Sequence, residues 1–459
     1  MYDIDLYLSA IDNWLWGPPL LILLIGTGVY LTFILRGVQF RYLFYAFKQA
    51  FGKQRKDSEG DISQYEALMT SLAGAIGTGT IVGVSTAIVV GGLGSMFWMW
   101  VTAFISMATK YSESLLAVRY RTMDDRGEMI GGPMQYMERG LGWKWMAMLF
   151  AFFASIAAIG TGNLLQVNAI AETVSHMWNI DPLWSGCALT IIVGLVLIGG
   201  VKSIGHTAGV IVPFMALFYM IAGIIIIAMH LDKFPAAISL IITSAFSGQA
   251  AFGGFAGATV MMAIQMGVAR SVISNEAGLG ISSIAAAAAK TDNPGRQAMI
   301  TMTGALLSTV VVCSITGLVL AVTEVLGKTN DTGEPLNGAS MAIHAFSTAL
   351  AGGDYIVSIG LIFFAFTTVI AWGYYGEKCC EYLIGERSII YYRMLYSLII
   401  IPGALLKLQT VWSIANIFNG LMAIPNLLAL VALSGVIVSE TKFFLKTVDE
   451  EYAEEARTE

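Results

Sequence analysis

Apolar runs of about twenty residues alternate with short polar segments along most of this chain. Runs of that length are typical of helices that cross a bilayer, whereas the strands of a membrane barrel are about half as long and alternate in polarity. The pattern predicts an all-α polytopic membrane protein with about eleven transmembrane helices. The expected spans lie near residues 14–36, 65–91, 93–120, 143–178, 183–200, 207–230, 254–280, 297–326, 355–384, 389–407 and 410–438.

The composition supports a membrane protein. Apolar residues make up 56% of the chain and charged residues only 12%, whereas about a quarter of the residues of an ordinary soluble domain are charged. The first apolar run follows Asp3, Asp5 and Asp12 rather than a basic segment, and it lacks a small-residue cleavage site. We therefore expect a spanning helix there and not a signal peptide.

Basic residues gather in alternate loops. They cluster after the first span, at 36–56, and after the third, at 119–144, whereas the intervening loops hold only Lys233, Lys328 and Lys407. Because basic loops are retained in the cytoplasm, we expect a plasma-membrane protein with its N-terminus outside and its C-terminus inside. An amphipathic stretch, 39–51, is expected to lie on the membrane surface.

Two glycine-rich segments interrupt predicted helices at matching places, Ala73-Gly-Ala-Ile-Gly-Thr-Gly-Thr80 and Gly253-Gly-Phe-Ala-Gly-Ala258, the latter running on to Gln265-Met-Gly267. Each internal glycine costs a helix about 1 kcal/mol relative to alanine. Unwound backbone inside a membrane persists only where it lines a protected cavity, and paired broken helices mark the substrate site of many transporters. We expect the second unwinding at 265–267. Close packing through small residues is the alternative.

After the first helix, the remaining spans divide into two groups of five, each opening with a broken segment. Because five is odd, the second group enters from the opposite side of the membrane, which predicts an inverted repeat. The expected divisions are an N-terminal helix with its amphipathic segment at 1–63, repeats at 64–230 and 231–440, and an acidic, solvated, disordered tail at 441–459.

Polar side chains within the spans supply candidate ligands. Freed amides at a break can hold a carboxylate, and freed carbonyls and threonine hydroxyls can hold a hard cation. Thr367 and Thr368 face mid-membrane with Trp372 one turn onward, while Asn163 and Gln166 share a helical face. Hydrogen bonds within or between helices remain an alternative for the polar residues, as does simple packing for the tryptophan.

The sequence also argues against some functions. Each Asp or Glu near a span falls toward one of its ends, which favours Na⁺ over H⁺ coupling. The sequence contains no GxxxxGK[ST] motif, which argues against an ATP-driven pump. The four cysteines and four histidines lack metal-site spacing, so we expect no cofactor, no enzyme activity and no nucleic-acid partner.

Three segments resemble the alanine or glycine:cation symporter family: Ser71 to Gly83, Gly131-Gly-Pro-Met-Gln-Tyr136, and Gly267-Val-Ala-Arg-Ser-Val-Ile-Ser-Asn-Glu-Ala-Gly-Leu-Gly280. The likeness covers nearly the whole chain. Members of that family are prokaryotic sodium/alanine symporters with one helix before a LeuT-like 5+5 inverted repeat. The geometry of that repeat is an established example of broken-helix sites.

The resemblance also implies roles for individual residues. It implies that Thr78 and Gly79 cradle the substrate carboxylate and that Trp372 covers its side chain. Gln265 and Gly267 are placed at the second break. The implied sodium ligands are Ala75 and Thr80 at a first site, and Ala73, Ile76, Thr367 and Thr368 at a second.

We therefore expect a secondary active symporter that imports a small neutral amino acid, alanine or glycine, with Na⁺ as coupling ion. The runner-up is a channel or sensor that binds an amino acid without transporting it. A membrane enzyme is disfavoured because no metal or nucleophile constellation is evident.

Overall fold

The computed structural model describes residues 2–52, 58–247, 259–329, 333–406 and 409–458. Nearly all of these residues are helical. The elements up to residue 230 are α1 (Tyr2–Leu15), α2 (Pro18–Ile34), α3 (Val38–Arg41), α4 (Leu43–Phe51), α5 (Gln64–Ala75), η1 (Thr78–Thr80), α6 (Val82–Gly91), α7 (Gly94–Arg119), β1 (Thr122–Met123), β2 (Met129–Ile130), α8 (Pro133–Gln135), η2 (Tyr136–Gly140), α9 (Lys144–Ala157), η3 (Ala158–Leu164), α10 (Leu165–Trp178), α11 (Pro182–Ile198) and α12 (Gly200–Met229). The later elements are α13 (Phe234–Ser247), α14 (Val260–Asn275), α15 (Ser283–Ala287), α16 (Pro294–Ala305), η4 (Leu306–Cys313), α17 (Ser314–Val322), α18 (Gly338–Ala349), α19 (Gly353–Ile384), α20 (Ser388–Leu398), α21 (Ile400–Leu405), α22 (Gln409–Ala432) and α23 (Ser434–Thr458).

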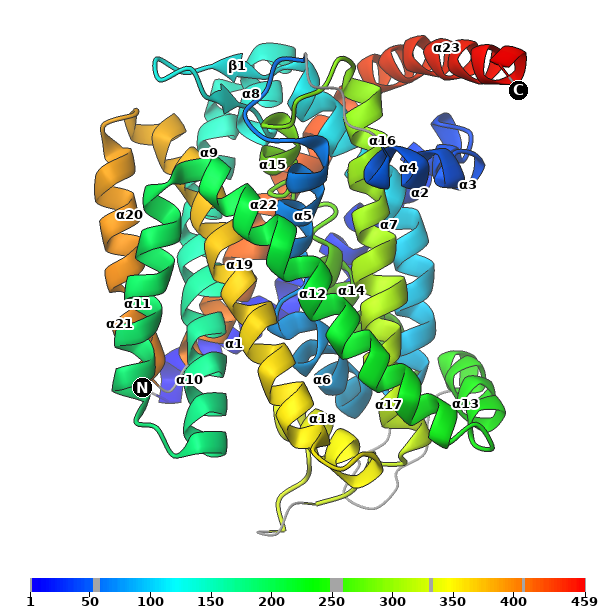
Figure 1. Cartoon of the computed structure of the whole chain (residues 1–459), viewed down its shortest axis with the longest axis vertical. Helices are drawn as coiled ribbons and strands as arrows, with labels where there is room; N and C mark the ends of the chain where they lie inside the picture. Colours follow the sequence, from blue (N-terminus) through cyan, green and yellow to red (C-terminus); the bar gives the residue numbers. More distant parts are fainter. Residues whose placement is uncertain (1, 53–57, 248–258, 330–332, 407–408, 459) are drawn as a thin grey trace.

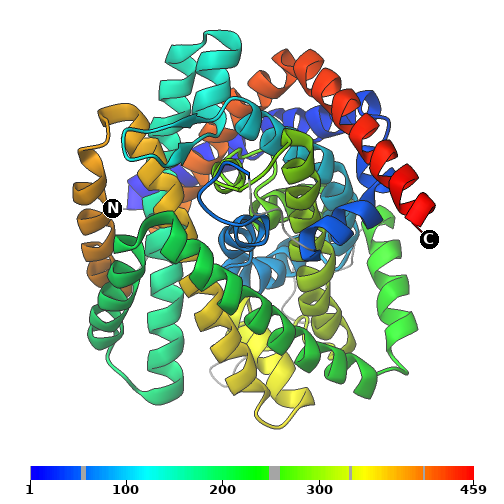
Figure 2. The same ribbon diagram turned by 45° about the horizontal axis from the view of Figure 1, so that its top comes forward.

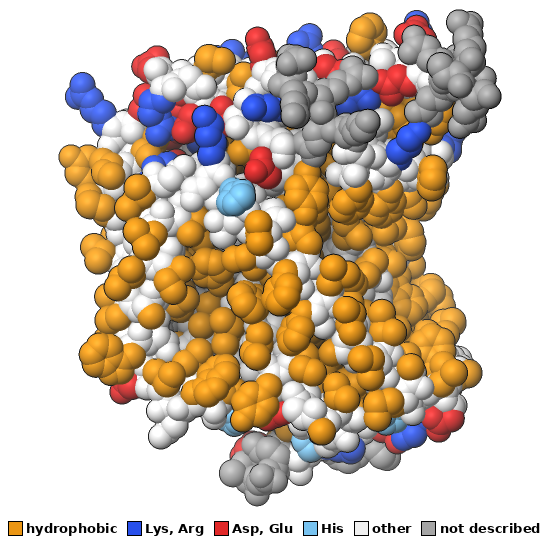
Figure 3. Space-filling model, in the orientation of Figure 1, with side chains coloured by type: hydrophobic (Ala, Val, Ile, Leu, Met, Phe, Trp, Pro, Cys, Tyr) orange, Lys and Arg blue, Asp and Glu red, His pale blue; other side chains and the backbone are white. Residues whose placement is uncertain are grey.

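The long helices run roughly parallel through one bundle (Figure 1). Among the described residues, seven helical stretches are long and apolar enough to cross a membrane, and the bent pair α5 and η1–α6 can supply an eighth span. Exposed apolar side chains cover the middle of the face shown in Figure 3, and charged side chains gather above and below them. The polytopic all-α architecture predicted from the apolar runs is thus confirmed.

Two of the bundle's central helices are interrupted. The first interruption separates α5 from η1 and α6 with a bend of 65°, as the glycine pattern at 73–80 predicts. The second lies between α14 and α15 and spans residues 276–282. This differs from the expectation at 265–267, where α14 is continuous; residues 253–257 lie outside the described part of the chain.

The short helices α3 and α4 form the expected amphipathic segment after the first span. The C-terminal tail differs from its expectation, because α23 continues as a helix through the acidic residues rather than being a disordered end. Figures 1 and 2 both place this helix beside the N-terminal segment that contains α4.

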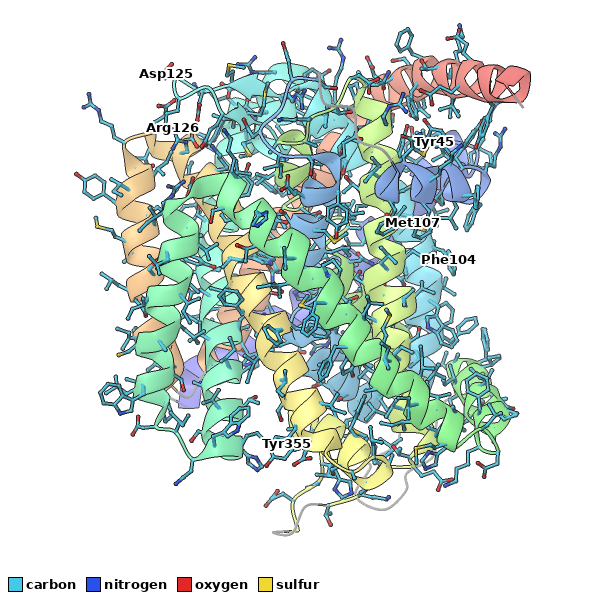
Figure 4. The ribbon with its side chains drawn as sticks, in the orientation of Figure 1. Tyr45, Phe104, Met107, Asp125, Arg126 and Tyr355 are labelled. Atoms are coloured by element: carbon cyan, nitrogen blue, oxygen red, sulfur yellow. The ribbon has the colours of Figure 1, made fainter. Side chains whose placement is uncertain are left out.

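A buried arginine holds the two segments together. Arg296, at the start of α16, is only 2% exposed. Its guanidinium donates to Glu451 of α23 at 2.6 Å and to the hydroxyl of Tyr45 of α4 at 2.9 Å. Figure 4 shows Tyr45 directly below the C-terminal helix. The contact explains why an acidic helix end is anchored rather than solvated.

We predict that Arg296→Leu detaches α23 from the bundle. Removing one partner of a buried ion pair costs about 3–5 kcal/mol, because the other charge is left uncompensated. The expected result is faster trypsin cleavage after Lys442 and Lys446 in the folded protein. Arg119→Leu is the matched control, since Arg119 makes an exposed ion pair with Glu440 and such pairs contribute little. Equal cleavage rates in the two variants contradict the prediction.

Candidate functional site

The first break is built from a capped helix that ends at two residues with non-helical backbone. A capping box of Ser63 and Glu66 starts α5. The helix ends at Ala75, because Ile76 has ψ 78° and Gly77 is extended. Gly77 is required by close packing: a Cβ there lies 2.5 Å from the Thr368 hydroxyl and 3.1 Å from the Gln166 amide oxygen. The glycine therefore lets α19 and α10 approach the unwound backbone.

A small cavity of about 20 Å³ lies beside this break, which is room for about one water molecule. It is enclosed by the first break, the end of α14 and the helices α10, α19 and α22. The residues that line it are Gly74, Ala75, Gly77, Gly79, Thr161, Gln166, Ile273, Leu279, Thr368, Trp372 and Asn419. Five of the sequence-predicted residues therefore meet at one place: Ala75, Gly79, Gln166, Thr368 and Trp372.

Gln166 faces the break, whereas Asn163 does not. The amide oxygen of Gln166 accepts a hydrogen bond from the Thr78 backbone N–H at 3.1 Å. The Asn163 amide donates instead to the Tyr396 carbonyl on α20 at 2.7 Å. The two were expected on one face of an α-helix, but Asn163 belongs to the π-helical turn η3. A π-turn adds a residue and changes the helical phase, so Asn163 points away from the cavity.

Two threonine hydroxyls lie close to carbonyl oxygens where α19 meets α5. The Thr368 hydroxyl lies 2.9 Å from the Ala73 carbonyl of α5 and from the Phe364 carbonyl of its own helix. The Thr367 hydroxyl lies 3.1 Å from the Phe363 and Phe364 carbonyls, so it bonds back to α19, as the alternative expected. Hydroxyl and carbonyl oxygens are suitable ligands for a hard cation. The Phe364 carbonyl was not predicted, because a backbone group of a continuous helix leaves no signal in the sequence.

The residues of the first implied sodium site lie apart from those oxygens. The Thr80 hydroxyl donates to the Gly77 carbonyl at 2.8 Å. The backbone carbonyl of Thr80 accepts a hydrogen bond from the Thr316 hydroxyl of α17 at 2.9 Å. Ala75 lines the central cavity, whereas Thr80 is not among the residues that line it. Ala75 and Thr80, which the family resemblance places at one sodium site, therefore do not both line the central cavity.

The positions expected at the second break belong instead to regular helix. The Gln265 amide lies 3.4 Å from the Trp16 carbonyl, on the side of the N-terminal helices. A Cβ on Gly267 lies 2.6 Å from the Ser95 carbonyl, so this glycine lets α14 pack closely on α7. The small-residue packing alternative is therefore correct for Gly267, and neither residue lines the cavity.

Trp372 is positioned by two glycines. A Cβ on Gly162 lies 2.2 Å from the Trp372 Cβ, so only a glycine in η3 admits the tryptophan. The indole N–H lies 3.3 Å from the Gly74 carbonyl of α5. The ring thus lies against the end of the half-helix and forms part of the cavity wall.

The lining residues that sequence reasoning missed include two polar ones, Thr161 and Asn419. The Asn419 amide of α22 donates to the Thr161 hydroxyl at 2.8 Å, while its amide oxygen is buried without a partner among the described residues. The Thr161 carbonyl in turn accepts from Gln166 at 3.1 Å. The weak signals were Thr161 between two glycines and Asn419 beside Gly420.

An open vestibule of about 490 Å³ reaches the break from the lower side of the bundle. It is lined by the lower part of α10 and by α18, and it reaches Thr78 of η1. The lining includes Asn168, Glu172, His176 and His344. Because Thr78 also follows the cavity residue Gly77, the vestibule and the central cavity adjoin at η1.

A charged hairpin lies on the upper side of the bundle. Lys378 of α19 lies 3.0 Å from Glu128 and from Glu381. Arg126 lies 3.0 Å from Asp124 and is labelled with Asp125 at the top of Figure 4. Although partial burial opposes ionisation, the Glu128 amide and the Lys378 and Arg126 charges hold the pKa of Asp124 below its usual value. The hairpin is thus fastened to α19 by ion pairs.

Acidic residues also lie deep in the bundle, contrary to the expectation that they fall toward span ends. Glu113 of α7 and Glu276 are fully buried. Glu113 accepts from the backbone N–H groups of Gly278 and Gly280 at 2.8 and 3.1 Å. Both glycines have positive φ, 89° and 76°. The carboxylate therefore satisfies amides that the second break leaves free.

Comparison with known proteins identifies the family. Residues 1–458 match the sodium:alanine symporter family. The chain belongs to that family. The symporter is 51% identical to the sodium/alanine symporter AgcS of Methanococcus maripaludis, over 95% of this chain and 96% of AgcS. It is also 51% identical to an uncharacterized transporter of Haemophilus influenzae, over 96% of each chain. Its relatives are named transporters, so this is a transport protein and not an enzyme.

Solved structures confirm the fold. The symporter resembles MhsT in complex with L-phenylalanine, with a TM-score of 0.62 at 11% identity, over 84% of this chain and 93% of that one. It also resembles the Eremococcus coleocola manganese transporter, with a TM-score of 0.53 at 12% identity, over 82% of this chain and 78% of that one. The symporter thus has the LeuT-like fold that the resemblance implied.

We predict that Gly77→Ala destabilises the protein through overpacking beside the cavity, whereas Gly79→Ala does not. A methyl at 77 meets the Thr368 hydroxyl at 2.5 Å, but a methyl at 79 makes an ordinary contact with Ile273 at 3.6 Å. Overpacking of this kind costs about 1–3 kcal/mol. The expected result is a lower melting temperature for Gly77→Ala alone in detergent. A comparable loss in both variants contradicts the packing argument.

Proposed function

We propose that this symporter imports alanine, and glycine as a second substrate, by coupling uptake to inward flow of Na⁺. The observation that carries the proposal is the small cavity at an interrupted helix, which adjoins a larger vestibule. The name of the 51% identical relative AgcS supports alanine and Na⁺. The small volume of a cavity whose lining includes three glycines and one tryptophan suits a substrate with a minimal side chain.

The substrate carboxylate is proposed to bind the freed amides of Thr78 and Gly79. The Thr78 N–H already donates to the amide oxygen of Gln166 at 3.1 Å. The same N–H is able to donate to a carboxylate oxygen of the substrate when that oxygen replaces the Gln166 amide. The partial positive charge of a helical N-terminus favours such binding. Trp372 is proposed to cover the substrate's side chain. Because the cavity holds about 20 Å³, Gln166 and Trp372 must shift to admit an amino acid.

The coupling ion is proposed to bind the carbonyls of Ala73 and Phe364 and the hydroxyls of Thr367 and Thr368, with the Ile76 carbonyl as a further ligand. These atoms join α5, which carries the substrate site, to α19. An ion there stabilises the broken helix in the arrangement that binds substrate. Each ligand must then raise the affinity of the other by the same factor.

The vestibule side is proposed to face the outside and the hairpin side the cytoplasm. Basic residues of the loops at 36–56 and 119–144 support this orientation, because positive loops are retained inside. This orientation places the N-terminus outside and the C-terminus in the cytoplasm. The vestibule then opens on the outer side, from which the substrate enters. The division of the later spans into two groups of five supports two repeats at 64–230 and 231–440, preceded by an N-terminal helix and its amphipathic segment at 1–63.

Proteoliposome uptake tests the proposal. Radiolabelled alanine should accumulate above equilibrium when Na⁺ is higher outside, and collapse of the Na⁺ gradient should abolish accumulation. Unlabelled glycine should compete. Alanine flux that equilibrates without accumulating, regardless of the ion gradient, identifies a channel and overturns the proposal.

We predict that Thr368→Val abolishes sodium stimulation of alanine binding, whereas Thr368→Ser retains it. Valine has the shape of threonine but lacks the hydroxyl oxygen that lies 2.9 Å from the Ala73 carbonyl. We expect the apparent sodium affinity to fall by about tenfold or more, that is by at least ~1.4 kcal/mol. Scintillation proximity binding across a sodium titration measures it. Unchanged sodium dependence in Thr368→Val removes this residue from the ion site.

A further inference from the structure

A sharp corner joins the spanning helix α2 to the surface helices α3 and α4. Arg36 has left-handed backbone, φ 53°, and Gly37 beside it has φ 65°. A positive φ is uncommon for a residue with a side chain, so the arginine holds its place in the corner against a local backbone preference. The turn leaves its side chain at the point where the span meets the surface helices.

An open groove of about 560 Å³ lies at this corner. Its lining joins apolar side chains at the end of the span to the guanidinium at the turn: Thr32, Phe33, Ile34, Arg36 and Gly37. Arg41 lies one helical turn further along, because its backbone N–H donates to the Gly37 carbonyl at 3.2 Å. The groove is thus apolar along α2 and basic beside the turn.

No carboxylate of the protein neutralises these two arginines. Arg36 and Arg41 are exposed, and neither side chain makes an ion pair or a hydrogen bond with any residue that the structure describes. The Arg41 guanidinium lies only over the ring of Tyr42, 5.6 Å from its centroid. Arg119, by contrast, pairs with Glu440 at 2.9 Å. Two neighbouring positive charges therefore remain available for an anion from outside the chain.

Exposed aromatic side chains lie beside these charges. Phe33 at the end of α2 is 84% exposed, and Phe44 of α4 is 83% exposed. Phe40 of α3 packs on Phe104 of α7 with ring centroids 6.0 Å apart. Figure 4 shows Phe104 on the outer edge of the bundle, below Tyr45. Phenylalanines next to basic residues are typical of a surface that lies at the boundary between lipid head groups and acyl chains.

The acidic C-terminal helix does not oppose an anion at this corner. Glu451 is paired with Arg296 at 2.6 Å. Figure 1 shows α23 above α4, on the side away from the apolar middle of the bundle. The negative charges of α23 are therefore directed away from the groove along α2.

The pairing of charge with apolar surface favours a phospholipid over a soluble phosphate. Guanidinium groups bind phosphate oxygens at two points, and a soluble phosphate uses only that contact. A phospholipid with a negative head group also covers the exposed phenylalanines with its acyl chains. The cytoplasmic leaflet carries such lipids, and basic segments next to a span attract them.

We propose that the α2–α3 corner binds one anionic phospholipid. The head group lies between Arg36 and Arg41, and the acyl chains lie along Phe33 and Phe104. The site is separate from the cavity and the vestibule. It rests on the proposed function only for the side of the membrane on which the corner lies.

Native mass spectrometry of the full-length protein in a neutral detergent tests the proposal. The measured quantity is the dissociation constant of the first bound phosphatidylglycerol. Arg36→Gln/Arg41→Gln should raise it about thirtyfold, because each basic residue near an anionic surface contributes about fivefold. Phosphatidylcholine with the same acyl chains should bind weakly, and equally to the wild type and this variant. Arg36→Lys/Arg41→Lys keeps both charges and should retain most of the affinity.

The matched control is Arg139→Gln/Arg387→Gln, which removes two exposed arginines from the same side of the bundle. It should bind phosphatidylglycerol as the wild type does. An equal loss in the control indicates general attraction to a basic face and overturns the inference, as does equal wild-type affinity for the two lipids.

Glycerol phosphate distinguishes a lipid from a soluble anion, because it has the charge without the acyl chains. It should not displace phosphatidylglycerol at equal concentration, and displacement overturns the lipid assignment. The measurement in detergent needs neither Na⁺ nor transport. A wild-type protein that binds phosphatidylglycerol but does not accumulate alanine therefore contradicts the proposed function alone.

Discussion

The structure depends on satisfying peptide groups that two interrupted helices expose inside an apolar bundle. Lipid provides no hydrogen bonds, so each freed N–H or carbonyl needs a partner from the protein. At the first break Gln166 accepts from the Thr78 amide and Thr368 donates to the Ala73 carbonyl. At the second, Glu113 accepts two amides in the Gly278–Gly280 turn. The two partners at the first break, Gln166 and Thr368, also line the cavity, so the stability of that break and the shape of the cavity depend on the same contacts.

This dependence explains the close packing at small residues. Gly77 admits Thr368, Gly162 admits Trp372, and Gly74 admits the Glu276 carboxylate. In each case a side chain reaches an interrupted backbone only because the opposing residue lacks a Cβ. A transporter must exchange such contacts during its cycle, and short polar contacts across glycines can separate without the loss of a large apolar interface. The glycines therefore serve both the closed packing and the movement.

Much of this architecture could be predicted from the sequence, and the failures have physical causes. Apolar run length predicted the bundle, and Gly74, Gly77 and Gly79 located the first break. The sequence analysis placed the second break at Gly267, which is a packing glycine. The actual break begins at Glu276 and is marked by positive φ values at Glu276, Gly278 and Gly280, which composition does not reveal. Asn163 was misassigned because a π-turn changed the helical phase. The Phe364 carbonyl could not be predicted, since any residue at that position offers the same oxygen.

The two buried glutamates show how environment divides one residue type into two roles. Glu113 has three donors on one oxygen, and Lys110 lies near both carboxylates. Both carboxylate oxygens of Glu276 lack a hydrogen-bond partner among the described residues and lie against the Gly74 position of α5. A carboxylate of the first kind fixes a turn, whereas the charge of the second kind is costly to bury without a compensating cation. Because Gly74 also lines the cavity, a movement of α5 changes the surroundings of the cavity and of Glu276 together.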